Sequence, residues 1–138
     1  MRQKAIQLAP ELSVSQWFNT AEDLTLAKLR GKIVVIEAFQ MLCPGCVAHG
    51  LPQAKAVHET FSREQVVVIG LHTVFEHHAA MTPVSLEAFL SEYEISFPVG
   101  VDARGTTDIP KTMQAYAMRG TPSLILIDGD GHLRAQYF

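Results

Sequence analysis

Two nearly continuous apolar runs, separated by a helical stretch, constrain the fold of this chain more than any other feature. The runs cover Lys32–Phe39 and Gln65–His72, and both are rich in β-branched residues, which predicts strands covered on both faces. Between them, apolar residues recur at helical spacing from Pro44 to Phe61, which predicts a helix. We expect the first run to be a central strand, and Pro52 to kink the helix that follows.

The remaining elements complete an alternating pattern of strands and helices. We expect a weak strand at Ser13–Phe18, a helical turn ending at Gly31, a helix over Val84–Tyr93, a strand over Phe97–Asp102, a short helix over Asp108–Met118 with Asp108 as its cap and Pro110 in its first turn, and a hairpin formed by Pro122–Asp128 and Leu133–Phe138. This order implies an α/β sandwich with a mixed sheet. With 138 residues, we expect the chain to form one domain, residues 1–138.

Charge and hydropathy exclude two classes of partner. Lys and Arg number 11 against 14 Asp and Glu, the formal charge is −3, and no basic stripe is present, so we expect no nucleic-acid binding. No stretch approaches the roughly 18–20 apolar residues of a membrane span. The start of the chain has no apolar run of secretory type, so we expect a cytoplasmic protein, or a periplasmic one if a leader has been trimmed.

The only two cysteines stand where the central strand gives way to the helix. They form the motif Cys43-Pro44-Gly45-Cys46. A helix N-terminus favours the thiolate needed for disulfide exchange, and proline suits the first helical position. We expect an exposed Cys43, with Cys46 one turn inside, as a redox pair. Half of a zinc site and two inert thiols are the alternatives.

These residues resemble the thioredoxin superfamily when they are taken together with a distant loop. The distant segment is RGTPSLILID, and LTLAKLRGKIVVIEAF, which leads into the motif, is similar to the TlpA-like and redoxin branch. The resemblance covers residues 25–138. It implies a thioredoxin-like three-layer sandwich with flanking helices and an insertion between the CxxC helix and a cis-proline loop. In that loop, Thr121-Pro122 would face the cysteines.

The resemblance also implies a thiol–disulfide oxidoreductase that needs no bound cofactor and no metal. Cys43 would attack a substrate disulfide, Cys46 would resolve the mixed disulfide, and Glu37 would exchange a proton with Cys46 unless it is a salt-bridge partner. The expected partners are a disulfide-containing protein or small thiol and an upstream electron donor. Expected substrate-binding residues are Pro44, Gly120, Thr121, Pro122, Phe39 and Leu42, with Phe39 belonging either to the core or to the substrate-facing rim.

Two departures from the family pattern keep other functions open. Leu42 stands where the family commonly has Trp, and Pro52 lies nine residues after Cys43 instead of eight. Counted from Cys46, the segment CVAHGLP resembles the peroxiredoxin helix, so a peroxidase with Cys46 oxidised and Cys43 resolving is one alternative. A metallochaperone that holds copper or zinc through both thiolates and a histidine is another.

The other polar motifs favour ordinary structural roles. We expect no metal at His72, His77 and His78, because a loop with adjacent histidines such as His77 and His78 is usually just solvated. We also expect Asp128–Gly131 to form a turn instead of a calcium loop. The resembled fold continues into one more helix after its last strand. We therefore expect a C-terminal helix missing from this sequence, or a second copy of the chain that covers the sheet as a homodimer.

Overall fold

One mixed sheet organises the chain. In the computed structural model, which describes residues 6–138, the sheet has seven strands in the order β1-β7-β6-β3-β4-β5-β2. The strands are β1 (Gln7–Leu8), β2 (Val14–Phe18), β3 (Ile33–Phe39), β4 (Val66–His72), β5 (Val99–Asp102), β6 (Ser123–Ile127) and β7 (His132–Tyr137). All but the short β1 were expected from the sequence.

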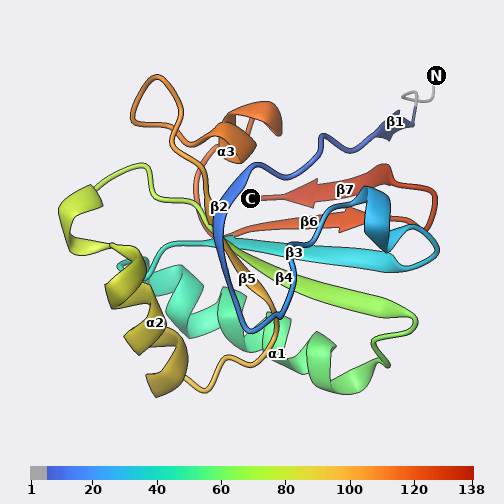
Figure 1. The fold of residues 1–138 in the computed structure, drawn as a ribbon, viewed down its shortest axis with the longest axis horizontal. Coiled ribbons are helices and arrows are strands. Elements are labelled where there is room, and N and C mark those ends of the chain that lie inside the picture. The colour runs from blue at the N-terminus through green and yellow to red at the C-terminus, as the bar shows by residue number, and fades with distance from the viewer. Residues whose placement is uncertain (1–5) are drawn as a thin grey trace.

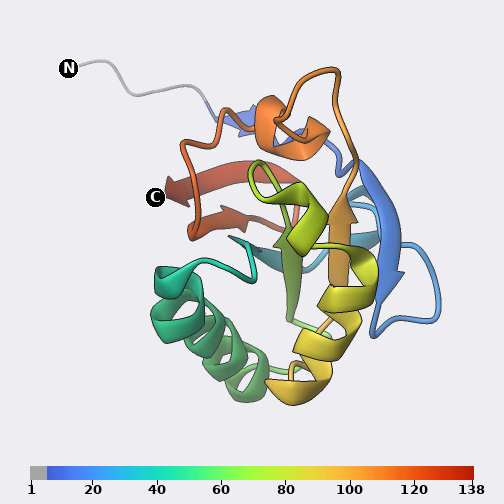
Figure 2. The same cartoon turned by 90° about the vertical axis from the view of Figure 1, so that its left-hand side faces the viewer.

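Helices cover both faces of this sheet. They are α1 (Leu51–Thr60), α2 (Pro83–Glu92) and α3 (Lys111–Ala115), with short turns η1 (Ala27–Leu29), η2 (Cys46–Gly50) and η3 (His78–Ala80). Figures 1 and 2 show α1 and α2 on one face and α3 on the other. The predicted three-layer α/β sandwich is therefore confirmed. No helix within residues 6–138 is long and apolar enough to cross a membrane.

Strand β3 is central, as its apolar sequence predicts. It pairs in parallel with β4 and antiparallel with β6. Because side chains alternate across a strand, Val34 and Ile36 pack in the core beneath α3, whereas Val35 and Phe39 join the core beneath α1 and α2. Glu37 lies between Val35 and Phe39 in this alternation. The strand therefore places one acid on the same face of the sheet as α1.

The cap of α3 differs from the sequence prediction. We expected Asp108 to cap this helix, but Pro110 occupies the cap position. The carboxylate of Asp102 instead accepts the backbone N–H groups of Thr112, at 2.8 Å, and Met113, at 3.0 Å. The acid comes from the end of β5, eight residues before the cap, and short-range capping patterns do not reach that far.

Candidate active site

The two cysteines occupy the turn that connects β3 to α1. The helical segment begins at Pro44, which leaves Cys43 half-buried at its start and Cys46 fully buried one turn later. The backbone N–H of Cys46 donates to Sγ of Cys43 at 3.3 Å. Both thiols are free. The geometry brings together one accessible sulfur and one sheltered sulfur, as expected for an exchanging pair.

The two thiols have different surroundings. Burial, with a smaller contribution from the hydrogen bond with Cys43, raises the pKa of Cys46 to about 12, while interactions with the Gln40 backbone and the Thr121 side chain act in the opposite direction. The thiol of Cys43 donates to the carbonyl oxygen of Thr121 at 3.6 Å. Cys46 is therefore protonated at neutral pH until a base removes its proton.

The Gly120–Pro122 loop faces the cysteines, as the resemblance implies. The Thr121–Pro122 peptide bond is cis, and the hydroxyl of Ser123 donates to the carbonyl of Gly120 at 2.6 Å. A β-carbon on Gly45 would lie 3.4 Å from Cδ of Pro122, which is ordinary van der Waals distance. The loop and the start of the active-site helix therefore touch.

Glu37 lies buried beneath the active-site turn. Its side chain is 1% exposed, and neither carboxylate oxygen has a hydrogen-bond partner among the described residues. Its neighbours across the sheet are Gly70 on β4 and Leu124 on β6, and neither ionises. Burial therefore raises the pKa of Glu37 from its ordinary value of 4.5 to about 8. No ion pair forms at Glu37 within residues 6–138.

Two predicted rim residues have opposite positions. The side chain of Phe39 is completely buried and packs beside the rings of His72 and Phe89. It belongs to the core, so its assignment to the substrate-facing rim is wrong. Leu42 is 58% exposed next to Cys43. Its assignment to the substrate-facing rim, and that of the exposed Pro44, stays a prediction.

Sequence reasoning missed a buried polar pair behind the active-site turn. His72 ends β4 and is buried, as expected for the last residue of a buried strand. Burial lowers the pKa of His72 to about 4, and its neutral ring accepts the backbone N–H of Met41 at 3.3 Å. Likewise, the side-chain oxygen of Gln40 accepts the backbone N–H of Phe75 at 3.2 Å. Both interactions hold the chain just ahead of Cys43.

A candidate metal cluster lies away from the cysteines. In the described part of the chain, the only group of three potential ligand side chains is Asp128, Asp130 and His132. Asp128 already accepts the backbone N–H groups of Asp130 and His132, as expected for a turn. Within residues 6–138, no histidine or carboxylate joins Cys43 and Cys46 as a third ligand.

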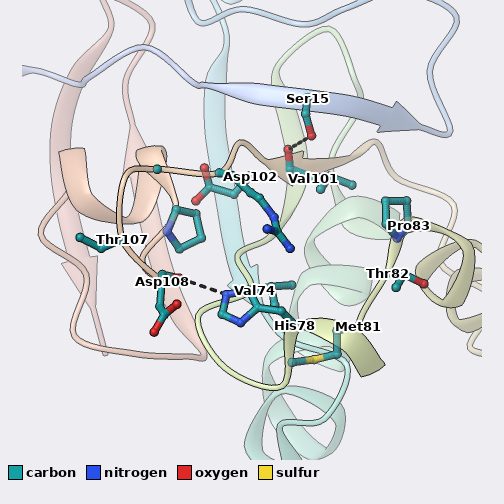
Figure 3. Close-up of a pocket in the computed structure, with 13 residues that line it drawn as sticks. Ser15, Val74, His78, Met81, Thr82, Pro83, Val101, Asp102, Thr107 and Asp108 are labelled. Atoms are coloured by element: carbon teal, nitrogen blue, oxygen red, sulfur yellow. Dashed lines mark hydrogen bonds between the residues drawn. The ribbon is translucent and has the colours of Figure 1, made fainter.

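A separate cavity of about 640 Å³ opens beyond the ends of β4 and β5. Its lining includes Val74, His78, Asp102 and Thr82 (Figure 3). The ring of His78 interacts with the backbone oxygen of Asp108 at 3.2 Å across one side of it. Neither cysteine nor Glu37 lines this cavity, and we assign it no part in the dithiol chemistry.

Comparison with known proteins gives one family and a consistent set of structures. The model of the AhpC/TSA family matches residues 6–136. The solved structure of thioredoxin-like superfamily protein SPOA0173 is 66% identical, covers 97% of this chain and 86% of its own, and superposes with a TM-score of 0.95. A thiol-disulfide isomerase from Corynebacterium glutamicum is 53% identical over 94% of this chain and 86% of its own, with a TM-score of 0.89.

Curated relatives are more distant and much longer. NHL repeat-containing protein 2 from Gallus gallus is 35% identical over 133 residues, which is 89% of this chain and 18% of that protein. Protein DipZ from Mycobacterium bovis is 28% identical over 129 residues, which is 91% of this chain and 18% of DipZ. The chain therefore spans less than a fifth of these two relatives.

Proposed function

Since the chain belongs to the AhpC/TSA family and has the thioredoxin-like fold of thiol–disulfide oxidoreductases, we propose that it reduces disulfides through Cys43 and Cys46. The observation that carries the proposal is the unequal exposure of two sulfurs in one helical turn. Cys43 is half-buried, whereas Cys46 is fully buried and its backbone N–H contacts Sγ of Cys43. Only Cys43 is open to a substrate.

The reaction proceeds in two exchanges. The Cys43 thiolate attacks one sulfur of the substrate disulfide, which breaks the S–S bond, releases the other sulfur as a thiolate and forms a mixed disulfide. The Cys46 thiolate then attacks Sγ of Cys43 and releases the second substrate thiolate. Two electrons pass to the substrate, and the protein is left with a Cys43–Cys46 disulfide. A separate dithiol donor must reduce this disulfide again.

Glu37 supplies the base for the second exchange. The thiol of Cys46 resists ionisation because it is buried, and a nearby acceptor lowers the barrier to its attack. A carboxyl group whose pKa is about 8 can both take and return a proton near neutral pH. Its two unpartnered oxygens leave it free to do so.

The cis-proline loop and the exposed rim provide the substrate contacts. Thr121 is partly accessible beside Cys43, and we assign its backbone to pairing with an extended substrate chain. Exposed Leu42 and Pro44 offer apolar contact next to the attacking sulfur. This surface suits a polypeptide disulfide or a small-thiol disulfide.

The two rival functions have less support. A peroxidase would need Cys46 to meet peroxide, but this sulfur is completely buried and its pKa is raised, which disfavours the thiolate that reacts. A metallochaperone would need a third ligand, and the described residues provide none beside the cysteines.

Turnover measurements separate these functions. With excess dithiothreitol as donor, the protein should reduce a peptide disulfide much faster than hydrogen peroxide. Cys43→Ser should abolish the reaction, and Cys46→Ser should accumulate a stable mixed disulfide through Cys43 that mass spectrometry detects. Faster turnover of peroxide, or mixed disulfides through Cys46 in Cys43→Ser, would contradict the proposal.

A further inference from the structure

The active-site helix contains one residue more than a regular helix would place there. The backbone N–H of Val47 donates to the carbonyl of Cys43, four residues earlier, but the N–H of Leu51 donates to the carbonyl of Cys46, five residues earlier. Segment η2 is thus a π-helical turn, which accommodates a single inserted residue. This turn explains why Pro52 lies nine residues after Cys43 where the resembled pattern has eight.

The π-turn ends at Gly50, where three parts of the active site meet. A β-carbon on Gly50 would overlap Oε1 of Glu37, lie 3.2 Å from Cδ of Glu37 and lie 2.9 Å from Cβ of Pro122. Gly50 is buried. Any side chain here would push apart the helix, the acid of β3 and the cis-proline loop.

Backbone conformation does not account for this glycine. Gly50 has φ −62° and ψ −53°, which are ordinary helical values that every residue adopts. Glycine in a helix is less favourable than alanine by about 1 kcal/mol. The structure therefore requires glycine at this position for space alone, and the space is filled by the Glu37 carboxyl.

We propose that Gly50 is a positioning residue for the proton chemistry of the dithiol. The π-turn packs the backbone of Gly50, which has no side chain, directly against the carboxyl group of Glu37. It thereby excludes water from this carboxyl group, which lies between β3, the helix and Pro122. This inference rests on the proposed function, in which Glu37 accepts the proton of Cys46. Gly50 acts through Glu37 and touches no substrate.

Few other ionisable groups face Glu37. The helical turn that covers it carries Cys43, Cys46 and His49, and the side chain of His49 is exposed to solvent. Strand β4 contributes His72, which is two residues from the Gly70 that pairs with Glu37 and is neutral because burial lowers its pKa. The absence of solvent is the one cause identified for the raised pKa of Glu37, so access of water to the carboxyl should dominate any change in its titration.

The test is a pH titration of Glu37 in the reduced Gly50→Ala protein. Carbon-13 NMR of the glutamate carboxyl groups monitors this titration. The Glu37 signal is assigned by its loss in Glu37→Gln. The added methyl group should displace the carboxyl toward water and lower its pKa by roughly one unit or more. Turnover at pH 7 should fall roughly tenfold with it.

Gly129→Ala is the matched control. Gly129 lies in the turn between β6 and β7, and a β-carbon there would meet Gly31 at 3.5 Å, an ordinary contact. In this variant, the pKa of Glu37 should equal that of the unaltered protein. A folded Gly50→Ala whose Glu37 also titrates like the unaltered protein would overturn the inference.

A shorter acid covers the case in which Gly50→Ala does not fold. Glu37→Asp withdraws the carboxyl by one methylene, so Gly50→Ala should lower the urea midpoint less in the Glu37→Asp protein than in the unaltered one. An equal loss in both backgrounds, or a failure of both to fold, would overturn the inference. The titration does not depend on enzymatic turnover. If the unaltered protein reduced no disulfide but Gly50→Ala still changed the pKa of Glu37, the proposed function would be refuted and the inference about Gly50 would stand.

Discussion

Two buried carboxyl groups in the same sheet have opposite environments. Asp102, at the end of β5, is 5% exposed and accepts three hydrogen bonds, from the N–H groups of Thr112 and Met113 and from the hydroxyl of Thr73 at 2.9 Å. Glu37, in the middle of β3, is 1% exposed and accepts none among the described residues. Burial raises the pKa of both, but at Asp102 the hydrogen bonds oppose the rise.

We infer a different role for each carboxyl group from this difference. A buried charge is tolerated when it is hydrogen-bonded, so Asp102 serves the fold by fixing α3 to the sheet. An unpartnered buried carboxyl makes the folded state less stable, and it persists at Glu37 beside the cysteines where we propose proton transfer. We therefore assign a structural role to Asp102 and propose a chemical one for Glu37.

The largest effect is expected for Glu37→Gln on turnover. Loss of the proton acceptor should slow disulfide reduction at pH 7 by about 100-fold, without preventing formation of the Cys43–Cys46 disulfide. Asp102→Asn is the isosteric control and should leave turnover per folded molecule unchanged. Initial rates from pH 6 to 9 provide the measurement. If Glu37→Gln turned over as fast as the unaltered protein across this range, Glu37 and Asp102 would no longer differ in their chemical roles.

Stability should respond in the reverse order. Asp102→Ala leaves two helix N–H groups and a buried hydroxyl without their acceptor, which should lower the free energy of unfolding by about 2–4 kcal/mol. Glu37→Gln removes no hydrogen bond and should be at least as stable as the unaltered protein at pH 8. Urea titrations test both, and a larger loss in Glu37→Gln would reverse the two roles.

The pH dependence of stability sharpens the comparison further. Glu37 binds its proton more tightly in the folded chain than in the unfolded chain. Its contribution to the free energy of unfolding is therefore full below its ordinary pKa of 4.5 and is lost as the pH rises through about 8. The free energy of unfolding should therefore fall by about 2–4 kcal/mol over this window. Glu37→Gln should flatten this slope, while Asp102→Asn should retain it. Equal slopes in the unaltered protein and Glu37→Gln would show that Glu37 titrates normally.

The smallest effect is expected at the acid that the sequence suggested as a cap. Asp108 is exposed, and among the described residues its side chain accepts no hydrogen bond, while its backbone oxygen interacts with the ring of His78. Asp108→Ala should change the free energy of unfolding by less than about 0.5 kcal/mol, against the much larger loss at Asp102. Similar losses at the two positions would restore Asp108 as the cap.

Features that depend on local pattern could be predicted from the sequence. The buried strands followed from their apolar runs, and the position of Cys43 and Cys46 followed from the junction of strand and helix. The burial of Phe39 was harder to predict, because a residue at the end of a strand can point either into the core or into the rim. The structure settles this by packing the Phe39 ring beside that of His72 in the core.

Other features depend on distant contacts that neither a local pattern nor the family resemblance indicates. The cap of α3 comes from Asp102 on another element, and no pattern near Asp108 signals it. The π-turn left a trace in the sequence, since Pro52 is displaced by one residue. Its consequence, the close approach of Gly50 to Glu37, requires the three-dimensional arrangement of helix and sheet.

The most direct test of the account is the rate at which each cysteine of the reduced protein is alkylated. Iodoacetamide labelling followed by peptide mass spectrometry at pH 7 reports the two thiols separately, because thiolate reactivity and access control the rate. The account predicts that half-buried Cys43 reacts much faster than fully buried Cys46. Faster labelling of Cys46 would contradict it and would favour a peroxidase with Cys46 as the reacting residue.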